Sequence, residues 1–160
     1  MIFRAAMVVA FPLLLTTARA DVNIDVTGFL LPPFCTVHDG SHGTIVVDFG
    51  DDININRIDG SRYRKTITYQ IDCESDGQLW QMKLKLVGPS AWDNQTLRSD
   101  KSSLGLRFQL GGQPVELGRD IPISSATVKP MLTVVPVLES QGSPTEGAFR
   151  ATASLQAEYY

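Results

Sequence analysis

Two histidines four residues apart, His38 and His42, are the first candidates for metal chemistry in this sequence. Together with a carboxylate such as that of Asp39, imidazole nitrogens are ligands that Zn²⁺ accepts. The residues around them, Asp39-Gly-Ser-His-Gly43, are typical of a turn, not of a helix that presents both rings on one face. The pattern therefore favours a solvent-exposed loop, and we expect no metal and no other cofactor.

Other motifs that could carry catalysis lack the partners they need. Asp48-Phe-Gly50 matches a kinase tripeptide, but the sequence has no glycine-rich loop, strand lysine or catalytic loop to accompany it. Asp51-Asp52 could hold a cation weakly, but the spacing of a calcium-binding loop does not follow. The sequence has no Gly-x-Ser-x-Gly, no phosphate-binding loop and no cysteine with a histidine partner. We therefore predict no catalytic residue and no enzyme activity.

The two tryptophans are candidates for stacking on a sugar. Trp80 lies on an alternating apolar face and is expected in the core. Trp92 lies in the loop Pro89-Ser-Ala-Trp-Asp-Asn94, where an aromatic ring either packs the loop or stacks on a ligand. Loop packing is the favoured interpretation, and a carbohydrate-binding surface remains the alternative.

The first twenty residues have the features of a secretory signal peptide. A basic start, Met1-Ile-Phe-Arg4, precedes an apolar stretch from Ala5 to Leu15 and a small-x-small site, Ala18-Arg19-Ala20. Cleavage after Ala20 removes two arginines, so the net charge of −3 becomes −5. A secreted chain with this acidic balance argues against binding to nucleic acid, which selects basic surfaces.

Cys35 and Cys73 are the only cysteines in the sequence. In an oxidising compartment they are expected to form a disulfide, because no other pairing is possible. In the chain-entropy model, closing this long loop in the unfolded chain stabilises the fold by roughly 3–4 kcal/mol.

The middle of the chain reads as short β-strands separated by turns. The expected strands show period-two alternation or β-branched runs: Thr44–Phe49, Thr66–Cys73, Trp80–Leu86, Leu104–Leu110 and Met131–Leu138. Pro136 argues that the last of these lies at an edge or a bulge. No window has convincing helical periodicity. Many short strands in a secreted chain predict one all-β domain, an antiparallel β-sandwich.

Each end of the mature chain carries an alternating strand. Apolar or aromatic residues occupy every second position of the last segment: Phe149, Ala151, Ala153, Leu155, Ala157 and Tyr159. Gly147 stands where a turn would precede this strand. At the other end, one face is shared by Val22, Ile24, Val26, Gly28 and Leu30. A glycine inside a strand often marks the close approach of another backbone, so Gly28 is a candidate contact site.

Together these features resemble the subunits of chaperone–usher pili of Gram-negative bacteria. The resemblance rests on the signal peptide, the extension containing Gly28, Pro32-Pro-Phe-Cys-Thr-Val37, the spacing to Cys73, Gly147 at the fourteenth position from the end, and the penultimate Tyr159. The Asp21-Val-x-Ile start and Ile45-Val-Val-Asp-Phe-Gly50 look most like the minor adaptor subunits near the pilus tip. We expect no added lectin domain, unlike a two-domain tip adhesin.

The resemblance implies an incomplete immunoglobulin-like β-sandwich that lacks its seventh strand and is completed by a donor strand from another chain. The implied organisation is a signal peptide at 1–20, a donor-strand extension at 21–33 and a pilin domain at 34–160. In donor-strand exchange, the extension of one subunit fills the groove of its neighbour. The residues expected to enter that groove are Val22, Ile24, Val26, Gly28 and Leu30.

The resemblance also implies the protein's partners and route. A periplasmic pilus chaperone would pair along the terminal strand, an outer-membrane usher would receive the complex, and neighbouring pilus subunits would replace the chaperone at the cell surface. The chaperone-binding residues are Gly147, Phe149, Ala151, Ala153, Leu155, Ala157, Tyr159 and Tyr160. Neither nucleic acid nor a small-molecule substrate is expected. The alternatives are a self-complete secreted carbohydrate-binding sandwich and, with little support, a secreted hydrolase.

Overall fold

The computed structural model of the chain describes residues 22–30, 34–74 and 81–159. The expected signal peptide, Trp80 and Tyr160 lie outside these residues. Contacts divide the chain into two units, residues 1–30 and residues 31–160. None of the described helical structure is long and apolar enough to cross a membrane.

The described part of the first unit, residues 22–30, has no regular secondary structure. Its large apolar side chains are all exposed, namely Val22, Ile24, Val26, Phe29 and Leu30. A Cβ atom placed on Gly28 would meet no atom within 4 Å. The alternating pattern of this segment therefore has no strand partner among the described residues.

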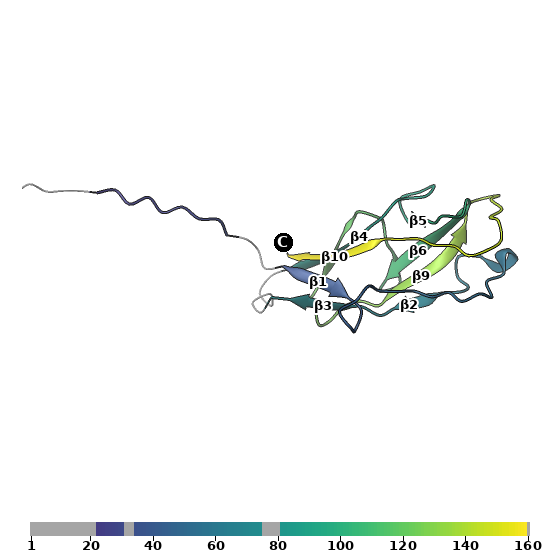
Figure 1. Cartoon of the computed structure of the whole chain (residues 1–160), viewed down its shortest axis with the longest axis horizontal. Helices are drawn as coiled ribbons and strands as arrows, with labels where there is room; N and C mark the ends of the chain where they lie inside the picture. Colours follow the sequence, from purple (N-terminus) through teal and green to yellow (C-terminus); the bar gives the residue numbers. More distant parts are fainter. Residues whose placement is uncertain (1–21, 31–33, 75–80, 160) are drawn as a thin grey trace, which may run out of the picture. The chain divides into compact units, whose positions relative to one another are not determined.

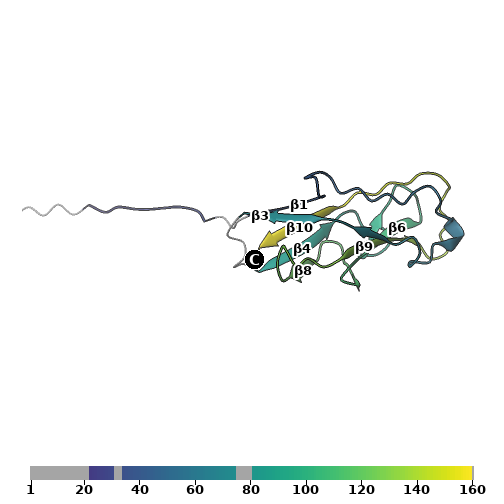
Figure 2. The same cartoon turned by 90° about the horizontal axis from the view of Figure 1, so that it is seen from below.

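The described residues of the second unit form antiparallel β-strands and one short 3₁₀ helix, η1 (Ile55–Arg57) (Figures 1 and 2). The strands are β1 (Cys35–His38), β2 (Lys65–Ile67), β3 (Gln70–Cys73), β4 (Met82–Val87), β5 (Thr96–Arg98), β6 (Leu104–Leu110), β7 (Gln113–Pro114), β8 (Asp120–Ile123), β9 (Leu132–Leu138) and β10 (Ser154–Tyr159). β1 pairs with β3, and β4 lies between β10 and β8. The largest sheet has the order β2-β9-β6-β5, with β7 attached to β6.

The hydrophobic core is formed by inward-facing side chains of all three sheets. β4 shows the predicted alternation most clearly, because Met82, Leu84 and Leu86 are buried while Lys83 and Lys85 are partly exposed. β6 and β9 are paired along their whole length and are buried over most of it. Burial of each large side chain stabilises the fold by about 1.5–3 kcal/mol, so this core accounts for most of its cohesion.

The expected strand Thr66–Cys73 changes sheet in its middle. β2 pairs with β9, whereas β3 pairs with β1. Tyr69 lies between them, is buried, and donates its hydroxyl hydrogen bond to the carbonyl oxygen of Pro130 at 2.7 Å. Burial raises the pKa of Tyr69 to about 12, so the phenol keeps its proton and this hydrogen bond.

Pro136 lies inside β9, opposite Leu106 of β6. On the other side of β9, pairing with β2 ends at Val134. β9 is thus an inner strand of its sheet, between β2 and β6, and not the edge strand that was expected, although Pro136 lies beyond the residues of β9 that pair with β2.

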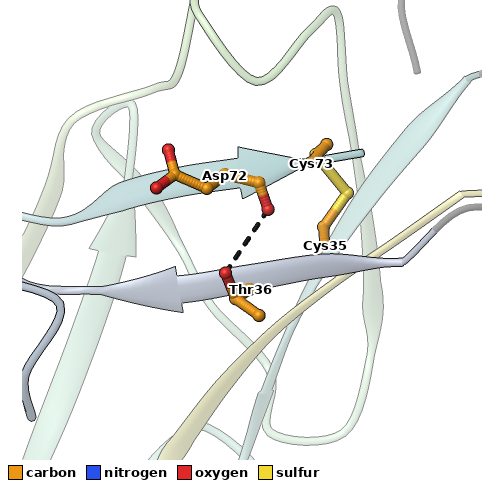
Figure 3. The surroundings of a disulfide bond; sticks show 4 residues. All are labelled: Cys35, Thr36, Asp72 and Cys73. Atoms are coloured by element: carbon orange, nitrogen blue, oxygen red, sulfur yellow. Dashed lines mark hydrogen bonds between the residues drawn. A yellow bond between two sulfur atoms is a disulfide. The ribbon is translucent and has the colours of Figure 1, made fainter. Parts of the chain in front are cut away.

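A disulfide joins β1 to β3 (Figure 3). Cys35 and Cys73 are direct partners in the antiparallel register, and their Cα atoms are 4.1 Å apart. In the neighbouring pair, the Thr36 hydroxyl donates to the carbonyl oxygen of Asp72 at 3.4 Å. Neither β1 nor β3 has another strand partner among the described residues, so the disulfide cross-links the two strands of this small sheet.

Candidate functional site

β10 lies at the edge of its sheet. It pairs with β4 from Ser154 to Tyr159, and no described strand pairs with its other edge. Ala157 is buried and Leu155 is half-buried on the inner face. Burial also raises the pKa of the Tyr159 phenol. The terminal strand thus has one apolar face on the core and one unpaired backbone edge.

β1 lies alongside β10 without hydrogen bonding to it (Figures 1 and 2). Between the two strands is a groove of about 490 Å³. Phe34, Cys35 and Val37 line one side of it, and residues 155–159 line the other. Because both strands are edges, the groove is bordered by backbone N–H and C=O groups without ladder partners.

Residues 44–49 continue the β1 side beyond a turn. We predicted a strand here, and this prediction was wrong in one respect, because the backbone is not paired with any described strand. The side-chain alternation is kept: Ile45 and Val47 pack against the core, whereas Val46 is 82% exposed. The segment therefore has the side-chain pattern of a strand but an open edge.

Residues 149–153 continue the β10 side in the same way. The predicted strand Phe149–Tyr160 is paired only from Ser154 onward, although the earlier apolar side chains pack against the core as expected. Gly147 adopts a φ of +107°, a conformation that L side chains rarely reach, and it makes the turn before this segment. The rings of Phe49 and Phe149 are 5.7 Å apart between centroids, so the two open segments approach each other.

The charges near the groove are neutralised by partners on the neighbouring strands. Glu158 is the only charged side chain among the described residues that line the groove, and it lies 3.5 Å from Lys83. Lys83 and Lys85 each lie 2.8 Å from Asp120 of β8. These hydrogen bonds lower the pKa of the Asp120 carboxyl and raise the pKa of Lys83. The groove is therefore suited to an extended apolar segment, not to a charged small molecule.

The tryptophan proposed as an alternative sugar site packs within the domain. Trp92 is half-buried, and a Cβ atom on Gly105 would lie 3.1 Å from its Cη2 atom. The next residue, Asp93, is held by Arg107 at 2.6 Å. The loop is thus anchored on β6, as the loop-packing interpretation requires.

Of the residues named in advance, those that border the groove are Cys35, Leu155, Ala157 and Tyr159. The expected donor residues lie in the other unit, and Tyr160 lies outside the described residues. Sequence reasoning did not name Phe34, Val37 or the apolar side chains of residues 44–49 as groove residues. The available signal was the apolar residue at every second position, namely Ile45, Val47 and Phe49, because this period indicates a strand-like segment with one buried face.

Comparison with known proteins gives a consistent match along the chain. Residues 22–160 match the family model described as fimbrial protein. The uncharacterized fimbrial-like protein YfcQ of Escherichia coli strain K12 is 33% identical over 88% of this chain and 88% of its own length. The fimbrial adapter PapF of Escherichia coli is 32% identical over 92% of this chain and 94% of its own length.

A solved structure of the P pilus adaptor subunit PapF superposes on this fold with a TM-score of 0.56 and 28% identity. The match covers 82% of this chain and 98% of that structure. The predicted fold, an all-β pilin sandwich that is incomplete along one edge, is thereby confirmed. On the strength of the family model and these relatives, the chain belongs to the fimbrial protein family.

Proposed function

We propose that this pilus subunit is completed by an extended strand from another chain, which fills the groove between β1 and β10. The observation that carries the proposal is that residues 44–49 and 149–153 keep the side-chain alternation of strands, although neither segment pairs with a described strand. An added strand would supply both the hydrogen bonds and the side chains that such an edge accepts, a mode established for pilins and their chaperones.

In the same proposal, residues 21–33 form the extension that enters the neighbour's groove, and the pilin domain begins at residue 34. The exposed alternating side chains of residues 22–30 support this role, because such apolar surface is stable only when another surface covers it. The division of the chain into two units at Leu30 is compatible with it. Contacts of this head-to-tail kind do not close on themselves, so they build a fibre.

Before assembly, the groove would be filled by a strand of a periplasmic chaperone that pairs along residues 147–160. An outer-membrane usher would then receive the complex. In this proposal the subunit is therefore exported through the periplasm. We also propose an adaptor position in the fibre, because the relatives include a fimbrial adapter that matches nearly the full chain. The assigned role is structural support of adhesion, without enzyme activity.

Periplasmic co-expression tests the proposal against a self-complete sandwich. The full chain is expressed with and without the chaperone of its own pilus system and then analysed by gel filtration. We expect a one-to-one complex with the chaperone, and degradation or aggregation without it. A stable monomer whose yield does not depend on the chaperone would contradict the proposal and favour the self-complete domain.

A further inference from the structure

A cluster of metal-ligating side chains lies on β1 and β3, on the face away from the disulfide. His38 ends β1, and Asp72 lies in β3, one diagonal step away from it in the antiparallel register. The Nε2 atom of His38 is 2.8 Å from Oδ2 of Asp72. The loop that follows β1 brings Nδ1 of His42 to 3.7 Å from the same oxygen. Figure 3 shows the Asp72 carboxylate pointing away from the disulfide.

We propose that His38, His42 and Asp72 form a binding site for a divalent transition-metal ion of the Zn²⁺ class. One donor atom from each residue lies within 4.8 Å of the others. Donors bound to zinc at 2.0–2.1 Å in a tetrahedron are about 3.3 Å apart, so the two measured separations bracket the required value. His42 is 76% exposed and can rotate to close the remaining gap.

His38 has the tautomer that a metal ligand needs, with its Nε2 lone pair free to bind the ion. Its Nδ1 atom is hydrogen-bonded to the carbonyl oxygen of Asp39, and since a carbonyl only accepts, Nδ1 carries the proton. The Nε2 lone pair of the neutral ring then faces the Asp72 carboxylate at 2.8 Å. Two electron-rich atoms at this distance need a positive charge between them, which is either a proton or a metal ion. A backbone carbonyl on the second nitrogen is the usual support of a zinc-bound histidine.

The loop at residues 39–43, which follows β1, holds His42 close to His38 and Asp72. The Asp39 carboxylate accepts hydrogen bonds from the backbone N–H groups of Gly43 and Ser41, both at 2.7 Å. These bonds lower the pKa of the Asp39 carboxyl, and because both use its Oδ1 atom they hold this side chain within the turn. His42 adopts a φ of +61°, and its ring lies 4.2 Å from the His38 ring between centroids. Asp39 therefore shapes the loop, and Asp72 replaces it as the third ligand.

The site has three protein ligands, which leaves a fourth position for water or for a group from another molecule. The ion would tie the loop at residues 39–43 to β3. That loop leads directly into residues 44–49, the unpaired segment that continues the β1 side beyond the turn. The inference itself does not depend on how the groove is filled.

The test is zinc binding by the full mature chain, purified without a histidine tag together with whatever chain occupies its groove. Isothermal titration with ZnCl₂ should show one site, and His42→Ala should weaken it at least about tenfold. Because His42 is exposed, this variant should keep the wild-type fold. Asp51→Asn, which removes an exposed carboxylate elsewhere, should bind zinc like the wild type.

A second measurement identifies the ligands independently. Co²⁺ bound to the wild-type complex should give the intense visible absorption of a tetrahedral site, and Asp72→Asn should remove that band. The wild-type and Asp72→Asn subunits are compared in complex with the same partner chain, so metal sites on the partner contribute equally to both spectra. The proposal would be overturned by the absence of stoichiometric zinc binding, or by equal affinity in wild type and His42→Ala, which would leave His38 and Asp72 as a simple hydrogen-bonded pair.

Discussion

Deletion of residues 154–160 is expected to remove the protein from the periplasm almost completely. The deletion takes away β10, which pairs with β4, buries Ala157 and forms one wall of the groove. The free energy of folding lost with β10 is comparable with the whole free energy of unfolding of a domain of this size, about 5–15 kcal/mol. Proteolysis of the unfolded chain should lower its periplasmic level roughly tenfold or more, as measured by immunoblot with the chaperone co-expressed.

Because the deletion also damages the domain, a matched pair of point variants tests the groove while keeping β10 in place. Leu155 is half-buried and lines the groove, whereas Ser154 beside it is exposed and does not. Leu155→Lys should lose co-purification with the chaperone, since the ammonium group would be desolvated beneath the incoming strand. Ser154→Lys should co-purify at wild-type yield. Equal recovery of both variants would show that the terminal strand is not the recognition element.

Replacement of Gly28 by leucine is expected to stop assembly while leaving the subunit intact. Burying Val22, Ile24, Val26 and Leu30 in a neighbour's groove would contribute about 1.5–3 kcal/mol each before the cost of ordering the segment. A glycine on this apolar face indicates a shallow place in that groove. Overpacking there costs about 1–3 kcal/mol, which weakens insertion about 5- to 150-fold.

Within its own unit, residues 1–30, Gly28 has room for the leucine side chain among the described residues. A Cβ atom at Gly28 meets nothing within 4 Å, so the melting temperature of the chaperone complex should not change. Thr27→Leu is the matched control, because it places the same side chain on the opposite face of the strand. Native gels of each variant mixed with the chaperone-bound neighbour should show strand exchange for Thr27→Leu and failure for Gly28→Leu. Normal exchange by Gly28→Leu would exclude this segment as the donor.

Periodicity predicted most of the paired strands and the side-chain faces of the groove. β4, β6 and β9 were found near their expected positions because each has a long alternating or β-branched run. Short strands such as β5 and β8 were missed, since three or four residues give no readable period. The break between β2 and β3 was also missed, because the alternation continues through Tyr69 while the partner strand changes.

The strand-binding groove could be predicted in part from the sequence. The β10 side was predicted more fully than the side continued by residues 44–49. The inner face of the terminal strand follows from its sequence alone, but an unpaired edge is a property of what lies beside it. Residues 44–49 show this limit, because their sequence predicts a strand and their surroundings give no partner. Of the proposed metal site, the sequence suggested His38 and His42 as candidate ligands, but it could not suggest Asp72, which meets His38 only through the register of β1 and β3.

Hydrogen–deuterium exchange of the assembled subunit is the most direct test of the central claim, that another chain's strand completes this sandwich. Residues 44–49 and 149–153 have no strand partner within the described chain. Apart from the Arg150 N–H, which donates to the Asp100 carboxylate at 2.8 Å, protection of their amides is therefore expected to come from the inserted strand. With the groove occupied, we expect both segments to exchange as slowly as β6 in the core, while an uninserted segment 22–30 in the same sample exchanges rapidly. Exchange of residues 44–49 and 149–153 at the rate of unprotected peptides in the assembled complex would contradict strand completion.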